Sequence, residues 1–123
     1  MLRAAAYDCG MVADVQDPGG PLFDRAHLSR YTDGDSALEA ELLGLFRDQA
    51  QRCLGLMDGV SDRGAWRAAA HTLKGSARGV GAMALGELCD KAEELHQPSW
   101  APAQARIALL VDETLAEMGL AEN

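Results

Sequence analysis

The sequence of 123 residues predicts one all-α domain, an antiparallel up-down-up-down four-helix bundle with a short extra N-terminal helix. Apolar residues recur at the three- and four-residue spacing of amphipathic helices, and no stretch alternates as a strand does. Short segments rich in glycine, proline and aspartate separate the helical stretches. Because these connections are short, neighbouring helices are expected to run antiparallel.

Residues 1–21 are expected to form a flexible or loosely docked extension, and the bundle is expected over 22–120. The boundary is a run of residues that break regular structure, Asp17-Pro18-Gly19-Gly20-Pro21. Directly after it, Asp24 can cap a short helix over 24–31.

Four longer helices follow. The first is expected over 35–57, with the aspartate or serine at its start as cap. The second is expected over 61–81, where glycines end it. The third covers 82–96 and is stopped by Pro98, and the last covers 99–118. Their apolar stripes include Cys53, Cys89 and Trp66, so these side chains are expected in the core.

Composition and charge exclude several functions. The formal net charge is −8, which argues against a nucleic-acid-binding protein and against docking on anionic membrane. No apolar run is long enough to span a bilayer, and the N-terminal alanines end too early for a signal-peptide core. We therefore expect a cytoplasmic protein that is monomeric, since nothing in the sequence demands a dimer.

The helix expected over 61–81 carries a histidine on its polar side. At about 100° per residue, His71 falls opposite the apolar stripe, which consists of Trp66, Ala69, Ala70, Leu73, Ala77 and Val80. Lys74, Gly75 and Arg78 follow the histidine on its own side, and Arg67 precedes it. The pattern predicts a solvent-facing imidazole surrounded by cations, which suits a nucleophile that must carry negative charge.

Gly75 strengthens this interpretation. Glycine inside a helix costs roughly 1 kcal/mol relative to alanine, and the neighbouring alanines show that a better helix former would fit the pattern. Because Gly75 points away from the apolar stripe, we interpret it as a position where another macromolecule approaches closely.

These residues belong to a longer pattern. The stretch Ala70-His71-Thr72-Leu73-Lys74-Gly75-Ser76-Ala77 is followed by Gly81-Ala82, Leu85, Leu88-Cys89 and Ala92-Glu93, and is preceded by Glu41-Leu42-Leu43-x-x-Phe46. The whole closely resembles a histidine-containing phosphotransfer (Hpt) domain over about 22–118. The resemblance implies a phosphorelay carrier: its histidine accepts a phosphoryl group from a receiver-domain aspartate and passes it to another receiver aspartate.

The resemblance also implies roles for individual residues. His71 would be the phosphoacceptor, Lys74 would neutralise the phosphoryl oxygens as a mobile point charge, and Gly75 would leave the approach open. No metal site and no cofactor are expected on this chain, because the receiver would bring Mg²⁺ together with the aspartate. Without a nucleotide-binding loop, the chain is expected to be a phosphocarrier rather than an autokinase.

Three further residues are candidates for partner contact. Arg67 and Arg78 can attract a receiver through long-range electrostatics. Gln49 lies at the edge of the apolar stripe of the preceding long helix and can reach toward His71. The expected partners are receiver domains of response regulators or of hybrid histidine kinases.

Three alternatives compete with this interpretation. Glu93-x-x-His96 has the spacing of di-iron bundle ligands, but only one such motif occurs. The dimerisation helices of a histidine autokinase would need an ATP-binding domain, for which 123 residues leave no room. A non-catalytic helical bundle that binds signalling partners is the remaining alternative.

Overall fold

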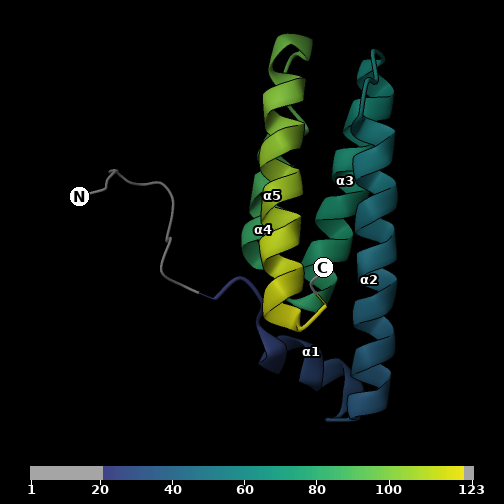
Figure 1. Ribbon diagram of the computed structural model, residues 1–123, viewed down its shortest axis with the longest axis vertical. Helices are drawn as coiled ribbons and strands as arrows, with labels where there is room; N and C mark the ends of the chain where they lie inside the picture. Colours follow the sequence, from purple (N-terminus) through teal and green to yellow (C-terminus); the bar gives the residue numbers. More distant parts are fainter. Residues whose placement is uncertain (1–20, 121–123) are drawn as a thin grey trace, which may run out of the picture.

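The computed structural model describes residues 21–120, which contain helices and no strand. The helices, labelled in Figure 1, are α1 (Arg25–Thr32), α2 (Ser36–Met57), α3 (Arg63–Val80), α4 (Met83–Ala92), the 3₁₀ turn η1 (Gln97–Ser99) and α5 (Trp100–Met118). The all-helical prediction is confirmed. The predicted extension, apart from Pro21, lies outside the described residues. Within them, no helix combines the length and apolar character needed to cross a membrane.

Aspartate side chains start three of the helices. Asp24, Asp35 and Asp62 stand just before α1, α2 and α3, and each accepts a hydrogen bond from the backbone N–H three residues on. Each bond satisfies one of the free N–H groups of a first helical turn. Gly81 and Gly119 end α3 and α5 with left-handed backbone angles. These starts and ends agree with the sequence prediction.

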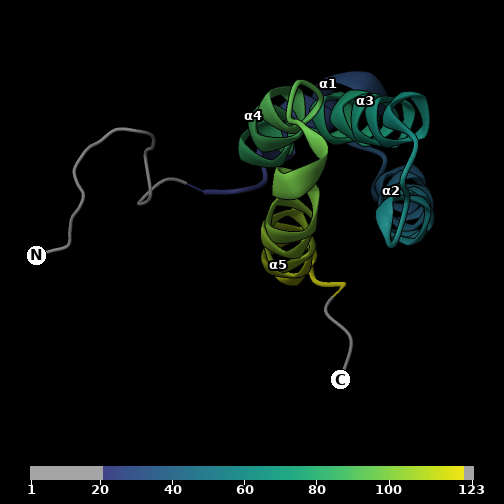
Figure 2. The ribbon, with the colours of Figure 1, turned by 90° about the horizontal axis from the view of Figure 1, so that it is seen from above.

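The four long helices form a ring. α3 lies between α2 and α4, and α5 closes the ring by packing against both α2 and α4. Figure 2 shows this arrangement from above. α1 lies across one end of the bundle, against α2 and α3 (Figure 1). A backbone hydrogen bond attaches the start of α1 to the end of α3: the Asp24 N–H donates to the Gly81 carbonyl at 3.0 Å.

Two tryptophans fill one part of the core. The rings of Trp66 and Trp100 stack 5.1 Å apart at 9°. Their indole N–H groups donate to the carbonyls of Ala92 and Leu95, at 2.8 and 2.9 Å. Both indoles are therefore buried with their polar atoms satisfied. Trp66 is in the core as predicted, and Trp100 caps it where α5 begins.

The two cysteines of the described region also lie in the core, as predicted. Cys53 and Cys89 are free thiols with almost no exposed surface. Burial raises the pKa of both thiols, that of Cys89 to about 12. They act as small apolar side chains, and their neutral form persists at physiological pH.

The helix expected over 82–96 is shorter than predicted. α4 ends at Ala92, and the chain then turns into the 3₁₀ segment η1. Pro98 has no N–H to donate to the Glu94 carbonyl. The Ser99 N–H donates to the His96 carbonyl at 2.9 Å, and the Leu95 carbonyl accepts from the Trp100 indole. The chain thus leaves α4 several residues before the proline, and the Trp100 indole satisfies a carbonyl beyond the end of the helix. Glu93 consequently stands at the end of α4.

Candidate functional site

His71 lies on the outer surface of α3, as its helical position predicted. Its side chain is 70% exposed. On the opposite side of the helix, Trp66, Ala70 and Leu73 are completely buried. Packing of this apolar side against the core therefore determines how α3 is rotated about its axis. The His71 side chain, on the other side of the helix, consequently faces solvent.

A buried glutamate orients the imidazole. Nδ1 of His71 lies 3.2 Å from Oε2 of Glu93, whose side chain is only 9% exposed. Burial opposes ionisation of Glu93, but hydrogen bonds from Lys74 and His71 and the Lys74 charge outweigh it, so the pKa of Glu93 lies below its usual value. A carboxylate accepts hydrogen bonds only, so this contact assigns the hydrogen of neutral imidazole to Nδ1. Nε2 then keeps its lone pair and is free to react.

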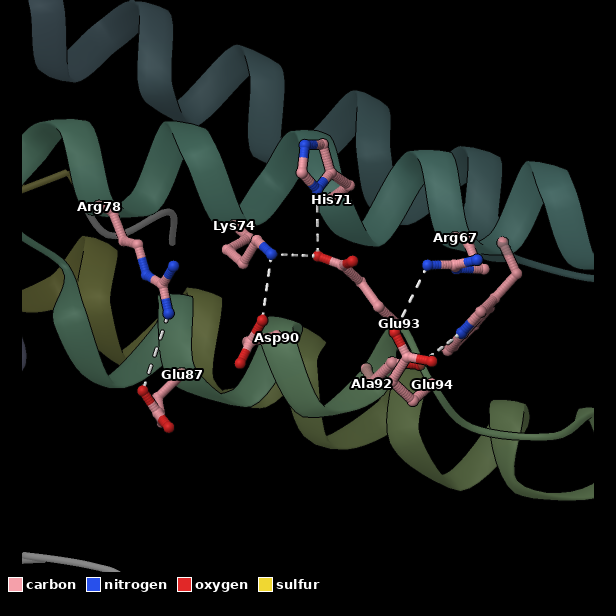
Figure 3. A network of polar contacts seen from close by, with 10 residues as sticks. Arg67, His71, Lys74, Arg78, Glu87, Asp90, Ala92, Glu93 and Glu94 are labelled. Atoms are coloured by element: carbon pink, nitrogen blue, oxygen red, sulfur yellow. Dashed lines mark hydrogen bonds and ion pairs between the residues drawn. The ribbon is translucent and has the colours of Figure 1, made fainter.

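Lys74 is held more firmly than the sequence indicated. Its Nζ atom lies 2.7 Å from Oε2 of Glu93 and 3.0 Å from Oδ1 of Asp90, and its side chain is 15% exposed. The hydrogen bonds to Glu93 and Asp90 raise the pKa of Lys74. Instead of a mobile point charge, the structure shows an ammonium group anchored between the carboxylates of Asp90 in α4 and of Glu93 directly after it (Figure 3).

The predicted ring of cations around His71 is a row of ion pairs. Arg67 contacts Glu94 at 3.4 Å and Arg78 contacts Glu87 at 3.8 Å, with Lys74 and its partners between them (Figure 3). As numbers rise along α3, the partners' numbers fall along α4, so these two helices run in opposite directions. The cations predicted around His71 are therefore paired with acids, which their helical positions on α3 could not indicate.

Gly75 lies open to solvent one turn after His71. An added Cβ would meet no atom within 4 Å. The same construction at Gly81 would bring a Cβ to 2.6 Å from the Asp24 carbonyl oxygen. Packing therefore requires glycine at Gly81 but not at Gly75.

Comparison with known families assigns this arrangement. The sequence model of the Hpt domain matches residues 41–118, from α2 to the end of α5. The chain belongs to the Hpt domain family. No curated protein and no solved structure matches the chain. The helix α1 lies before the matched region, and His71, Lys74, Gly75 and Glu93 all lie inside it.

The surface of this Hpt domain is hollowed along the second half of α3, at Ser76, Gly79 and Val80. A groove of about 640 Å³ lies between α1, α2 and α3. Apolar side chains form much of its wall, namely Leu28, Tyr31, Leu42, Leu45, Phe46 and Val80. Tyr31 and Leu45 are 70% and 58% exposed. Leu45 thus lines the groove from α2 instead of packing in the core.

Gln49 belongs to this groove rather than to the histidine network. It lines the groove together with Ser76 and Gly79 of α3. Its Oε1 atom accepts a hydrogen bond of 2.7 Å from Arg52. Within residues 21–120 no hydrogen bond joins Gln49 to His71, so the expected reach toward the imidazole is not observed. Gln49 remains a candidate for partner contact at the groove.

The di-iron alternative finds no support in the Hpt structure. Glu93 is engaged by His71 and Lys74, and His96 lies beyond the end of α4. Across the part of the chain that the structure describes, no group of three or more His, Cys, Asp or Glu side chains is placed to hold a metal ion.

Sequence reasoning placed Glu93 in the family pattern but did not recognise it as a site residue. Asp90 was missed altogether. The available signal was the spacing of the acids along α4: Glu87, Asp90 and Glu94 recur at three and four residues, which puts them on one side of a helix. Only the pairing of α3 with α4 shows that this side faces His71.

Proposed function

We propose that this Hpt domain is a phosphorelay carrier in which Nε2 of His71 accepts a phosphoryl group from the phosphoaspartate of one receiver domain and passes it to the aspartate of another. The family supports a histidine phosphotransfer role in two-component systems. The observation that carries the proposal is the exposed imidazole of His71, whose Nδ1 is held by the buried carboxylate of Glu93.

The transfer step follows from this geometry. The lone pair of Nε2 attacks phosphorus, the N–P bond forms, and the P–O bond to the aspartate breaks as the carboxylate leaves with its electron pair. The positive charge that develops on the imidazole is offset by Glu93 next to the Nδ1 hydrogen. Positioning and charge neutralisation are the principal requirements of phosphoryl transfer. The reverse step, to a second receiver, uses the same contacts.

The chain supplies the acceptor but not the rest of the reaction. We infer that the receiver brings the aspartate and its Mg²⁺, and that this domain neither binds a cofactor nor phosphorylates itself from ATP. The domain would act as a cytoplasmic monomer built as an antiparallel up-down-up-down bundle.

The groove beside α3 is the surface that a receiver would cover. On the helix surface Gly75 follows His71 by one turn and Gly79 by two, and Gly79 lines the groove, so the groove lies further along α3 than the histidine. The exposed apolar side chains Tyr31 and Leu45 supply area that a partner can bury. The absence of a side chain at Gly75 leaves the path from this surface to His71 open.

A transfer assay tests the proposal. Purified receiver domains are phosphorylated with radiolabelled acetyl phosphate and Mg²⁺, then mixed with the wild-type domain, with His71→Gln and with the control His96→Gln. The wild type and the control should become labelled, with label that is stable in alkali and lost in acid as expected for an N–P bond. His71→Gln should remain unlabelled while keeping its helicity. Label on His71→Gln would refute the acceptor assignment, and binding without any label would favour the non-catalytic interaction module.

The absence of autokinase activity has its own test. The isolated domain, incubated with radiolabelled ATP and Mg²⁺, should stay unlabelled. Stoichiometric self-labelling would refute the carrier assignment in favour of a kinase.

A further inference from the structure

Within residues 21–120, Asp90 contacts the phosphoacceptor network only at Lys74. Its Oδ1 atom lies 3.0 Å from Nζ of Lys74, while Lys74 also contacts the Oε2 atom of Glu93 that faces His71. Figure 3 shows the order of these groups: imidazole, Glu93, Lys74, Asp90. Apart from the through-space effect of its charge, Asp90 can therefore influence His71 through the position and charge of Lys74.

We propose that Asp90 is a positioning residue that competes with the phosphoryl group of phosphorylated His71 for the ammonium of Lys74, and so limits how far phosphorylation of His71 proceeds at equilibrium. This inference rests on the proposed role of His71 as phosphoacceptor. It adds a residue of this chain that tunes the phosphorylated state without contacting the imidazole.

Lys74 has too few N–H donors to bind Glu93, Asp90 and several phosphoryl oxygens at once. An ammonium group has three N–H donors, and in the structure two of them are directed at Glu93 and Asp90. A phosphoryl group on Nε2 adds about two negative charges and three acceptor oxygens to the ring whose Nδ1 shares the Glu93 carboxylate with this lysine. To neutralise that group with more than one hydrogen bond, Lys74 must release one of its carboxylates.

The two carboxylates differ in how easily they are released. Glu93 has a side chain that is only 9% exposed and also accepts from His71, so losing the lysine would leave a buried charge poorly compensated. Asp90 has a side chain that is 47% exposed, so water can replace the lysine there. Lys74 is therefore expected to keep Glu93 and to exchange Asp90 for the phosphoryl oxygens.

The net charge of Glu93, Lys74 and Asp90 also disfavours phosphorylation of His71. Before phosphorylation, Glu93, Asp90 and Lys74 together carry one net negative charge, because the pKa values of both acids lie below their usual values and that of Lys74 lies above. Removing the Asp90 charge would leave the remaining pair neutral and free one donor for the phosphoryl group. The phosphorylated state should then become more favourable.

The experiment measures an equilibrium that needs no receiver. Phosphoramidate transfers its phosphoryl group to Nε2 of His71: one P–N bond breaks, another forms, and ammonia leaves. At fixed phosphoramidate and ammonium concentrations, the ratio of phosphorylated to free His71 is read by NMR and approached from both directions. Asp90→Asn should raise this ratio about fivefold, and Asp90→Glu should stay within about twofold of the wild type because it restores the carboxylate.

Glu87→Gln is the matched control. It removes one carboxylate from the same helix, one turn from Asp90, but its partner is Arg78 and not Lys74. Its ratio should stay within about twofold of the wild type. In a Lys74→Gln background, Asp90→Asn should change the ratio no more than Glu87→Gln does, because the residue through which Asp90 acts is missing.

The measured ratios distinguish competition for Lys74 from an effect of net charge, from a structural role of Asp90 and from failure of the proposed function. An unchanged or lower ratio in Asp90→Asn overturns the competition, and an equal rise in Glu87→Gln assigns the effect to net charge alone. A rise that persists in the Lys74→Gln background shows that Asp90 does not act through the lysine. If wild-type His71 is phosphorylated neither by phosphoramidate nor by a phosphorylated receiver, the proposed function itself is refuted. A merely structural role of Asp90 would change the free energy of unfolding and leave the ratio unmoved.

Discussion

Nδ1 of His71 lies 3.2 Å from Oε2 of Glu93, a residue 22 positions further along the chain. The histidine stands mid-way along α3 and the glutamate directly after α4, so the contact depends on the packing of the two helices. It assigns separate tasks to the two ring nitrogens: one binds the protein and the other faces solvent.

Replacing Glu93 by glutamine should disturb this division. A glutamine can still accept a hydrogen bond from Nδ1 but carries no charge to offset the imidazole during transfer, so we expect phosphorylation of His71 to slow about tenfold. The hydrogen of neutral imidazole should also distribute between both nitrogens, which ¹⁵N NMR of the ring detects. Unchanged transfer and an unchanged tautomer in Glu93→Gln would show that the contact has no orienting role.

Alanine substitution should change the free energy of unfolding in opposite directions at Gly75, inside α3, and at Gly81, which ends it. Gly75→Ala should raise the free energy of unfolding by up to about 1 kcal/mol, because the added methyl group meets open space and alanine is the better helix former. Gly81→Ala should lower it by about 1–3 kcal/mol, because a φ of +94° and the nearby Asp24 carbonyl oppose a Cβ. Urea unfolding of both variants provides the comparison.

A long acidic side chain at Gly75 separates stability from function. Gly75→Glu should keep a melting temperature at or above that of the wild type, since nothing lies within 4 Å of the new Cβ. Transfer from a phosphorylated receiver should nevertheless fall steeply, because the side chain obstructs the phosphoaspartate and repels its charge. An unfolded variant whose folded fraction transfers normally would show that Gly75 is required for packing.

The parts of the fold that depend on local signals were predictable. Asp24, Asp35 and Asp62 begin their helices because a short acidic side chain can accept from the free N–H groups of the next turn. Gly81 ends α3 because it adopts a left-handed conformation without a steric cost. The exposure of His71 followed from the apolar stripe on the other side of the same helix.

The surroundings of His71 were not predictable in this way. The position of Arg67 and Arg78 on α3 is local information, but their pairing with Glu94 and Glu87 depends on the register between two helices. The segment after α4 also involves another element, because the Leu95 carbonyl accepts from the Trp100 indole of α5. Neither relationship has a signature within a single helical stretch.

Acid should weaken the attachment of α1 through Glu39. This carboxylate accepts hydrogen bonds from Thr32 and Ser29, both at 2.9 Å, and pairs with Arg25 at 3.3 Å. The bonds from Thr32 and Ser29 lower the pKa of Glu39 below its ordinary value of 4.5. Because the folded-state pKa is the lower one, the stabilisation is present above about pH 4.5 and is lost as the pH falls through the folded-state pKa.

Glu39→Gln isolates this contribution. The variant should be less stable than the wild type at neutral pH, and the difference in free energy of unfolding should narrow as the pH falls from about 5 to about 3. Urea unfolding at several pH values measures it. A difference that stays constant over this range would mean that ionisation of Glu39 contributes nothing to folding.

Substitution of two equally exposed leucines, one inside the groove and one outside it, should affect phosphoryl transfer differently. Leu45 of α2 and Leu109 of α5 are 58% and 60% exposed, so glutamate at either position changes the charge equally and is tolerated by the fold. Leu45 lines the groove beside α3 and Leu109 does not. If a receiver covers this groove, Leu45→Glu should slow transfer from a phosphorylated receiver about tenfold, since the complex would bury an unpaired charge. Leu109→Glu should transfer at the wild-type rate, and labelling by phosphoramidate should be equal in both variants because it needs no docking. Equal transfer rates from the receiver in the two variants would place the receiver on another face of the domain.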